Sequence, residues 1–127
     1  MITEEELGAI HLRMVAMLAE GGAFLDGIYY CPHHPEGEVL RYAEECDCRK
    51  PRPGMLERAA RENGLLLADC ILVGDTLRDV EAAHAGGARA VLVRTGHGEH
   101  TLAENAEHVA EHVAQDLRAA VDWILSR

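Results

Sequence analysis

The sequence predicts an α/β protein with a parallel sheet, because it combines buried-strand patterns, helical periodicity and closing glycines. The near-continuous apolar runs at residues 70–73 and 90–93 are typical of strands buried on both faces. Segments with apolar residues at helical spacing precede, separate and follow these runs, and glycine closes most of them. Since parallel strands must be joined by a crossover, which is usually a helix, this alternation favours parallel pairing. We expect one domain, or part of one.

Length, composition and charge exclude several classes of protein. A chain of 127 residues has about the length of one domain, and its 48% of hydrophobic and 27% of charged residues exclude a disordered chain. The formal net charge of -10 argues against nucleic-acid and anionic-membrane partners, because the long-range field repels phosphate polymers. The sequence begins without the pattern of a signal peptide, and no run approaches the ~18 apolar residues of a membrane helix. We therefore expect a cytoplasmic domain.

The first thirty residues predict a helix and then a strand. Thr3 and Glu6 have the spacing of a capping box, and apolar residues recur at helical spacing as far as the Gly-Gly pair at 21–22. Residues 28–30 are apolar and β-favouring, which predicts a short strand. Periodicity is lost over residues 32–52, and a loop of that length in a compact domain is usually functional or ordered by a ligand.

The remaining elements follow from the same signals. A Pro-Gly pair at 53–54 suits the first turn of a helix, since proline lacks the N–H that is unpaired there. The Thr-Gly-His-Gly segment at 95–98 is predicted to be flexible, and residues 99–111 to be a polar connection. The expected order is a helix at 53–63, a strand at 70–73, a helix at 77–85, a strand at 90–93 and a helix at 116–125.

Two pairs of metal-binding residue types flank the long loop. One residue separates the members of each pair, twelve residues lie between the pairs, and together they offer three thiolates and one imidazole. This donor set is that of a closed, tetrahedral zinc site, which would also give the loop a defined shape. The alternatives are coincidental spacing and the imidazole of His34, whereas Cys70 lies in a predicted strand as a small hydrophobic residue. The candidate ligands are Cys31, His33, Cys46 and Cys48.

A cluster of cations follows the second pair of cysteines. Arg49, Lys50 and Arg52 lie just before the helix that begins at residues 53–54. Free N–H groups in the first turn of a helix attract anions, so these side chains and the helix together predict an anion site. The alternative is a solvated basic turn.

Two carboxylates follow the strand at 70–73. Asp75 lies at the carboxyl end of this strand, where open α/β sheets bind their ligands, and Asp79 lies one helical turn further on. A carboxylate in this place suits Mg²⁺, which is held by a few oxygen ligands and keeps several waters. Asp79 would approach the same region or orient a neighbour. The alternative role for Asp75 is a cap on the following helix.

In their order along the chain, these motifs resemble the zinc-containing branch of the haloacid dehalogenase (HAD) superfamily. The sequence is most similar to the D-glycero-D-manno-heptose 1,7-bisphosphate 7-phosphatase family, which supplies lipopolysaccharide precursors. The resemblance covers residues 3–98 and implies a HAD-like (Rossmannoid) parallel sheet with helices and an inserted zinc-binding loop at residues 31–48. The motifs that carry it are Cys-Pro-His-His-Pro from residue 31, Cys-Asp-Cys-Arg-Lys-Pro-x-Pro-Gly from residue 46, Val-Gly-Asp-Thr-x-x-Asp from residue 73 and Val-Leu-Val-Arg-Thr-Gly from residue 91.

The resemblance implies hydrolysis of a phosphate ester on a small phosphorylated sugar. Lys50 would be catalytic, because it stabilises the phosphoryl group, and would contact the substrate together with Arg49 and Thr76. Asp75 would bind Mg²⁺. Structural Zn²⁺ would be held by Cys31, His33, Cys46 and Cys48. The resemblance also implies a monomer.

The chain departs from this family at the nucleophile. The family uses an Asp-x-Asp-Gly motif near its amino terminus, but no Asp-x-Asp occurs in these 127 residues. We therefore expect residues 1–127 to be the carboxy-terminal portion of a single HAD-like phosphatase domain. This portion would be inactive alone and, through an open strand edge at 70–73, prone to self-association.

Three alternatives to this interpretation stay open. The first is a histidinol-phosphate phosphatase, whose metal loop has fewer residues after the histidine. The second is a non-catalytic, zinc-stabilised module that binds phosphosugars. The third is a phosphatase assembled from two polypeptides.

The ligand spacing predicts one tightly bound zinc ion per chain. Elemental analysis of protein purified in reducing, chelator-free buffer is expected to find it, and the variants C46S and C48S are expected to lose it because each removes a thiolate ligand. C70S is the matched control and is expected to keep the metal. Wild-type protein without zinc would contradict the assignment.

Overall fold

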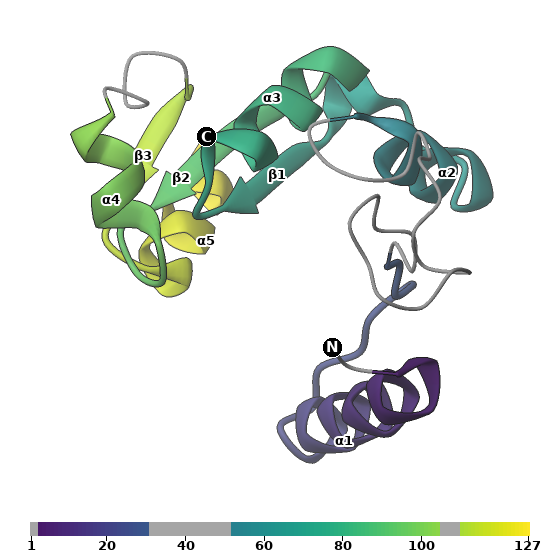
Figure 1. Cartoon of the computed structure of the whole chain (residues 1–127). Coiled ribbons are helices and arrows are strands. Elements are labelled where there is room, and N and C mark those ends of the chain that lie inside the picture. Colours follow the sequence, from purple (N-terminus) through teal and green to yellow (C-terminus); the bar gives the residue numbers. More distant parts are fainter. Residues whose placement is uncertain (1–2, 31–51, 105–109) are drawn as a thin grey trace. The chain divides into compact units, whose positions relative to one another are not determined.

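The computed structural model describes residues 3–30, 52–104 and 110–127 of the chain (Figure 1). The chain divides into two compact units, Met1–Cys46 and Asp47–Arg127. The predicted zinc ligands and the basic residues Arg49 and Lys50 lie outside the described residues. Among the described helices, none has both the length and the apolar character that crossing a membrane requires.

The described residues of the first unit form one helix, α1 (Glu4–Glu20). The Thr3 hydroxyl oxygen accepts a hydrogen bond from the backbone N–H of Glu6 at 3.1 Å, and Gly21 caps the other end, so both predicted ends are confirmed. The strand predicted at 28–30 is wrong. These residues are irregular and lie half-buried or exposed, and the Tyr30 ring lies 5.6 Å from that of His11. An apolar triplet becomes a strand only where a neighbouring strand takes up its backbone hydrogen bonds.

The second unit is built on a parallel sheet with the strand order β1-β2-β3. The strands are β1 (Ile71–Gly74), β2 (Arg89–Val93) and β3 (His112–Ala114). Val91 of β2 pairs with Val73 on one side and with His112 on the other. The parallel α/β prediction is therefore confirmed, but β3 was not predicted; it lies between the polar connection predicted at 99–111 and the helix predicted at 116–125. Three residues that begin with a histidine carry too short an apolar signal to be recognised.

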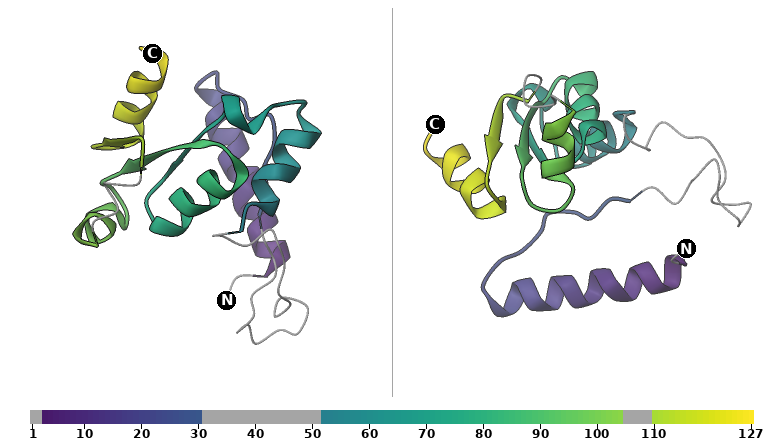
Figure 2. Two further views of the ribbon diagram at one scale, coloured as in Figure 1. Left: turned by 90° about the horizontal axis from the view of Figure 1, so that it is seen from above. Right: turned by 60° about the vertical axis from the view of Figure 1, so that its left-hand side comes forward.

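Helices cover both faces of this sheet (Figure 2). Alternate residues of β2 point to opposite sides: Leu92 packs with Val80 and Ala83 of α3, whereas Val91 packs with Ala120 of α5. The alanines at these contacts let the helices approach the sheet closely. The helices of this unit are α2 (Gly54–Glu62), the 3₁₀ helix η2 (Leu67–Asp69), α3 (Leu77–Gly86), α4 (Gly98–Ala103) and α5 (Leu117–Leu125).

The predicted helices of the second unit are confirmed, with ends within a residue or two. Asp116 caps α5 by accepting from the N–H of Ala119 at 2.8 Å, and Gly87 ends α3 with a φ of 90°, a conformation that favours glycine. In contrast, α4 replaces the first part of the polar connection predicted at 99–111. Its residues Gly98 and Thr101 are buried, so tertiary packing and not helical periodicity determines this helix.

The strand β1 is less buried than its sequence predicts. All four of its residues are only partly buried, whereas residues 90–93 of β2 are buried. The reason is the strand order, because β1 pairs only with β2 among the described residues and so lies at an edge of the described sheet. The open edge expected at 70–73 is thus present in this part of the chain, and self-association through it stays a prediction.

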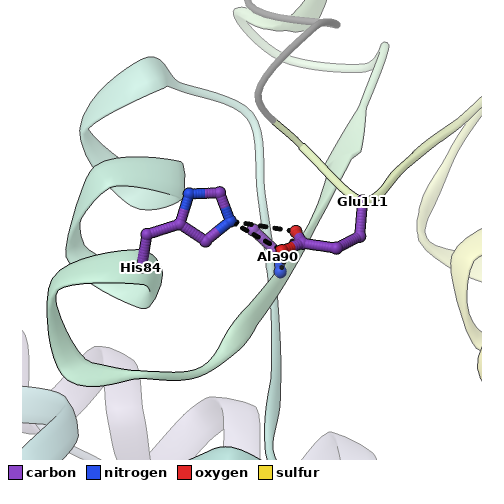
Figure 3. A network of polar contacts seen from close by, with 3 residues as sticks. All are labelled: His84, Ala90 and Glu111. Carbon is purple, nitrogen blue, oxygen red and sulfur yellow. Dashed lines mark hydrogen bonds and ion pairs between the residues drawn. The ribbon is translucent and has the colours of Figure 1, made fainter.

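A carboxylate joins α3, β2 and the start of β3 (Figure 3). Glu111 accepts hydrogen bonds from the N–H of Ala90 at 2.9 Å and from Nε2 of His84 at 2.8 Å. The N–H of Glu111 in turn donates to the Ala90 carbonyl at 3.0 Å. Burial raises the pKa of Glu111, but the hydrogen bonds from His84 and Ala90 outweigh it, so the pKa lies below the ordinary value.

The lowered pKa of Glu111 predicts how stability depends on pH. Because the carboxylate is favoured in the folded state, its contribution is complete above the unfolded pKa of about 4.5 and is lost as the pH falls through the lower, folded pKa. In urea unfolding, E111Q is expected to lower the free energy of unfolding at pH 7 by about 1 kcal/mol, and to flatten its decline below about pH 4.5. The matched control E81Q changes an exposed carboxylate of α3 and should do neither. An E111Q curve parallel to that of the wild type would contradict this account.

Candidate functional site

Asp75 lies at the carboxyl end of β1, as the sequence predicts. Its Oδ2 accepts a hydrogen bond from the backbone N–H of His97 at 2.9 Å, and the residue is half-buried. The helix α3 is capped by Thr76 and not by Asp75, because the Thr76 hydroxyl accepts from the N–H of Asp79. The alternative role of Asp75 as a helix cap is therefore wrong. Its carboxylate lies at the end of the strand without being part of the cap of α3.

Asp79 orients the turn that carries Asp75. It is only 5% exposed, and its Oδ2 accepts from the N–H of Asp75 at 3.1 Å, the N–H of Thr76 at 3.1 Å and the Thr76 hydroxyl at 2.9 Å. With the bond from its own N–H to the Thr76 hydroxyl, this completes a capping box. Of the two roles expected for Asp79, the structure supports orientation of a neighbour.

Two glycines make room for the two carboxylates. A Cβ on Gly74 would come within 2.5 Å of the Asp79 carboxyl group, so the last residue of β1 must be glycine for this side chain to fold back over it. A Cβ on Gly96 would collide with Oδ2 of Asp75, and Gly96 has a φ of 62°. The carboxylates and their glycines are therefore one structural unit.

The segment before α4 holds Asp75 from the other side. Besides the bond from His97, the hydroxyl of Thr101, which is 4% exposed, lies 2.8 Å from the Asp75 carbonyl and can donate to it. The prediction of a flexible segment at 95–98 is therefore wrong, because it is tied to the end of β1. Sequence reasoning missed His97 and Thr101. The available signal was Gly96 and Gly98, which follow soon after a buried strand, because glycine also marks places where the backbone approaches a site closely.

An open pocket of about 410 Å³ lies between the first turn of α3 and α4. We call it the α3–α4 pocket. Two of its lining residues, His97 and Thr101, are those that contact Asp75, so the pocket adjoins the end of β1. Its polar lining residues are Thr76, Arg78, His97, His100, Thr101 and Glu104.

Of the two predicted metal sites, the Mg²⁺ site at Asp75 lies within the described residues and the zinc site does not. Oδ2 of Asp75 accepts from His97, and an oxygen donor beside the end of a strand fits Mg²⁺, which prefers oxygen ligands. Within the described residues, no group of three histidine, cysteine or carboxylate side chains is arranged to hold a metal. Binding of Mg²⁺ by Asp75 stays a prediction. The zinc set, Cys31, His33, Cys46 and Cys48, lies outside the described residues and stays a prediction, as do the roles of Arg49 and Lys50.

The described fold and site define a class of protein. A parallel α/β sheet with a carboxylate at the end of a strand, followed by a capped helix, is typical of α/β proteins that bind small ligands at that edge. Residues 47–120 match the HAD-hydrolase-like family, which is more than half of the chain. The chain belongs to this family.

Similar proteins carry phosphatase names. The chain is 41% identical to a D-glycero-beta-D-manno-heptose-1,7-bisphosphate 7-phosphatase of Yersinia pestis, with 99% of this chain and 60% of that protein covered. It is 42% identical to the protein of that name from Escherichia coli K12, with 94% and 63% covered. Among solved structures, the chain is similar to D,D-heptose 1,7-bisphosphate phosphatase from B. bronchiseptica, which was crystallised in complex with magnesium and phosphate. The two have a TM-score of 0.82 and 39% sequence identity, and the match covers 97% of this chain and 65% of that one. The chain thus spans slightly less than two thirds of these proteins.

The Asp79 contacts predict a large effect of one substitution. D79A is expected to lower the free energy of unfolding by about 3 kcal/mol, because it leaves three donors of the turn at residues 75–76 without their charged acceptor. D122A, which removes an exposed carboxylate of α5, is the matched control and should cost less than about 0.5 kcal/mol. Urea unfolding of the two variants measures the difference. Equal losses would show that Asp79 does not hold the turn.

Proposed function

We propose that this chain forms part of a sugar-phosphate phosphatase that hydrolyses D-glycero-D-manno-heptose 1,7-bisphosphate at the 7-phosphate. The observation that carries the proposal is the 41% identity to a phosphatase of that name along almost the whole chain, with a carboxylate fixed at the end of β1. The substrate would be a small phosphorylated sugar, and the enzyme would act in the cytoplasm as a monomer.

Asp75 is the residue through which we connect the described structure to this chemistry. Mg²⁺ held there would neutralise charge on the phosphoryl oxygens, and the relative solved with magnesium and phosphate supports this choice of ion. Asp75 itself would bind the ion, while the bond from His97 keeps its carboxylate in one orientation. Asp79 would act only by positioning the turn, because its Oδ2 is occupied by the donors of residues 75–76.

The other predicted site residues complete the proposal. Lys50 would stabilise the transferring phosphoryl group and Arg49 would recognise the substrate. The zinc ion, held by the four ligands from Cys31 to Cys48, would fix the loop that carries both cations. Thr76 lines the α3–α4 pocket, but its hydroxyl already donates to Asp79 at 2.9 Å. Contact with substrate would therefore be made by its methyl group or backbone.

A second candidate function is a non-catalytic module that binds phosphosugars. The observation that favours it is the absence of any Asp-x-Asp from the 127 residues, since HAD-like phosphatases, which this sequence resembles, use such a motif as nucleophile and acid/base. A module of this kind would keep the anion-binding cations and the fixed Asp75 turn but would release no phosphate.

The missing nucleophile predicts that the 127-residue chain has no meaningful phosphatase activity. Purified chain, incubated with D-glycero-D-manno-heptose 1,7-bisphosphate and Mg²⁺, is expected to release phosphate no faster than a buffer blank. The reason is that a lysine and one metal-binding aspartate cannot replace a covalent nucleophile. The full-length Yersinia pestis relative serves as the positive control. Robust phosphate release that D75N abolishes would show that a nucleophile exists elsewhere in this chain.

A further inference from the structure

We propose that the α3–α4 pocket is a second anion subsite, in which Arg78 and His97 hold a phosphate group of a small phosphorylated molecule. The proposal rests on the proposed function only in taking that molecule to be the substrate of the phosphatase. The anion site itself is argued from the pocket. Its volume of about 410 Å³ lies within the range of small-molecule sites and exceeds what a phosphate group alone would need.

The cations of the pocket are available to a ligand. The pocket contains one arginine, two histidines and one glutamate, in a chain whose overall charge is -10. The glutamate, Glu104, lies 3.2 Å from Nε2 of His100, so these two side chains already face each other. Within the described residues, neither the Arg78 guanidinium nor the His97 ring has an acceptor. An arginine offers a fork of N–H donors that matches phosphate oxygens, and the histidine ring offers at least one N–H in either protonation state.

The backbone adds donors to the same place. Arg78 is the second residue of α3, a helix of ten residues, and the capping box satisfies the N–H of Asp79 but not those of Leu77 and Arg78. Orphan N–H groups in the first turn of a helix favour a negative charge, so the backbone and the Arg78 side chain attract the same kind of ligand. Six of the seven residues that line the pocket carry a polar or charged group, and Leu77 is the exception.

A metal ion is the main competing ligand for a pocket with two histidines and a glutamate. His97, His100 and Glu104 do not meet around one point, because no group of three such side chains in the described residues is arranged to hold a metal. The pocket is also tied to the reaction site proposed above, since His97 and Thr101 both contact Asp75. The pocket therefore adjoins the place where the proposed function puts the phosphate that is hydrolysed.

Binding of two probes to the complete 127-residue chain tests the proposal. The probes are inorganic phosphate and glucose 6-phosphate, with glucose as the uncharged control, and the readout is the shift of backbone amide signals in ¹H–¹⁵N spectra recorded without Mg²⁺. Both anions, but not glucose, are expected to shift the signals of residues 76–78 and 97–101. R78A is expected to weaken binding about tenfold, the effect of losing one charge-assisted hydrogen bond, and H97A several-fold. R118A removes an exposed arginine of α5 and should bind as the wild type does.

The same titrations separate this inference from the proposed function. If R78A and H97A weaken binding while R118A leaves it unchanged, the subsite exists even if the phosphatase assignment fails. If R78A and H97A bind like the wild type, the inference is wrong. Loss of binding in K50A alone would then leave the proposed function standing. Thermal unfolding of each variant shows that it is folded, and loss of binding in a variant that melts like the wild type counts for the subsite.

Discussion

The buried carboxylate of Asp79 is the group on which the described site depends. A carboxylate that is 5% exposed must be hydrogen-bonded to avoid a large desolvation cost, and Asp79 achieves this with the N–H groups and hydroxyl of residues 75–76. The same bonds begin α3, end β1 and aim Asp75 away from the helix. Asp75 then takes the N–H of His97 and so positions the turn before α4. The Asp79 carboxylate thus connects β1 to α3 and, through Asp75 and His97, to the turn between β2 and α4.

The sequence predicted elements whose signals are local and missed those that depend on a neighbour. The helix α1 carries its own cap at Thr3, and α5 carries one at Asp116, so both could be recognised without the fold. The strand β3 exists because it pairs with β2, and α4 exists because Thr101 and Gly98 pack against the ends of two strands. The false strand at 28–30 is the converse case, since its apolar residues have the propensity but no partner among the described residues.

The same division between local signals and contacts with distant segments holds for the site. Asp75 could be predicted because a polar residue at the end of a buried strand is a pattern within one segment. The contribution of His97 could not be predicted from the sequence. It is a backbone N–H, which does not depend on residue type, and it comes from 22 residues further along the chain. The hydroxyl of Thr76, a predicted substrate contact, is engaged by Asp79, and only the turn geometry reveals this. The zinc loop is predicted from ligand chemistry alone and lies outside the described residues.

The strong negative charge of the chain places a limit on how such a site can work. At physiological ionic strength charges are screened beyond about 8 Å, so the repulsion of an anionic substrate by distant carboxylates is weak, whereas cations at contact distance act fully. Asp75 alone is a poor metal site, since Mg²⁺ is normally bound by one or two carboxylates together with substrate phosphates. Metal and phosphate would then bind better together than apart, and by linkage each must strengthen the other by the same factor. A pocket that holds a second phosphate would add to this coupling, because it would keep the first one close to the end of β1.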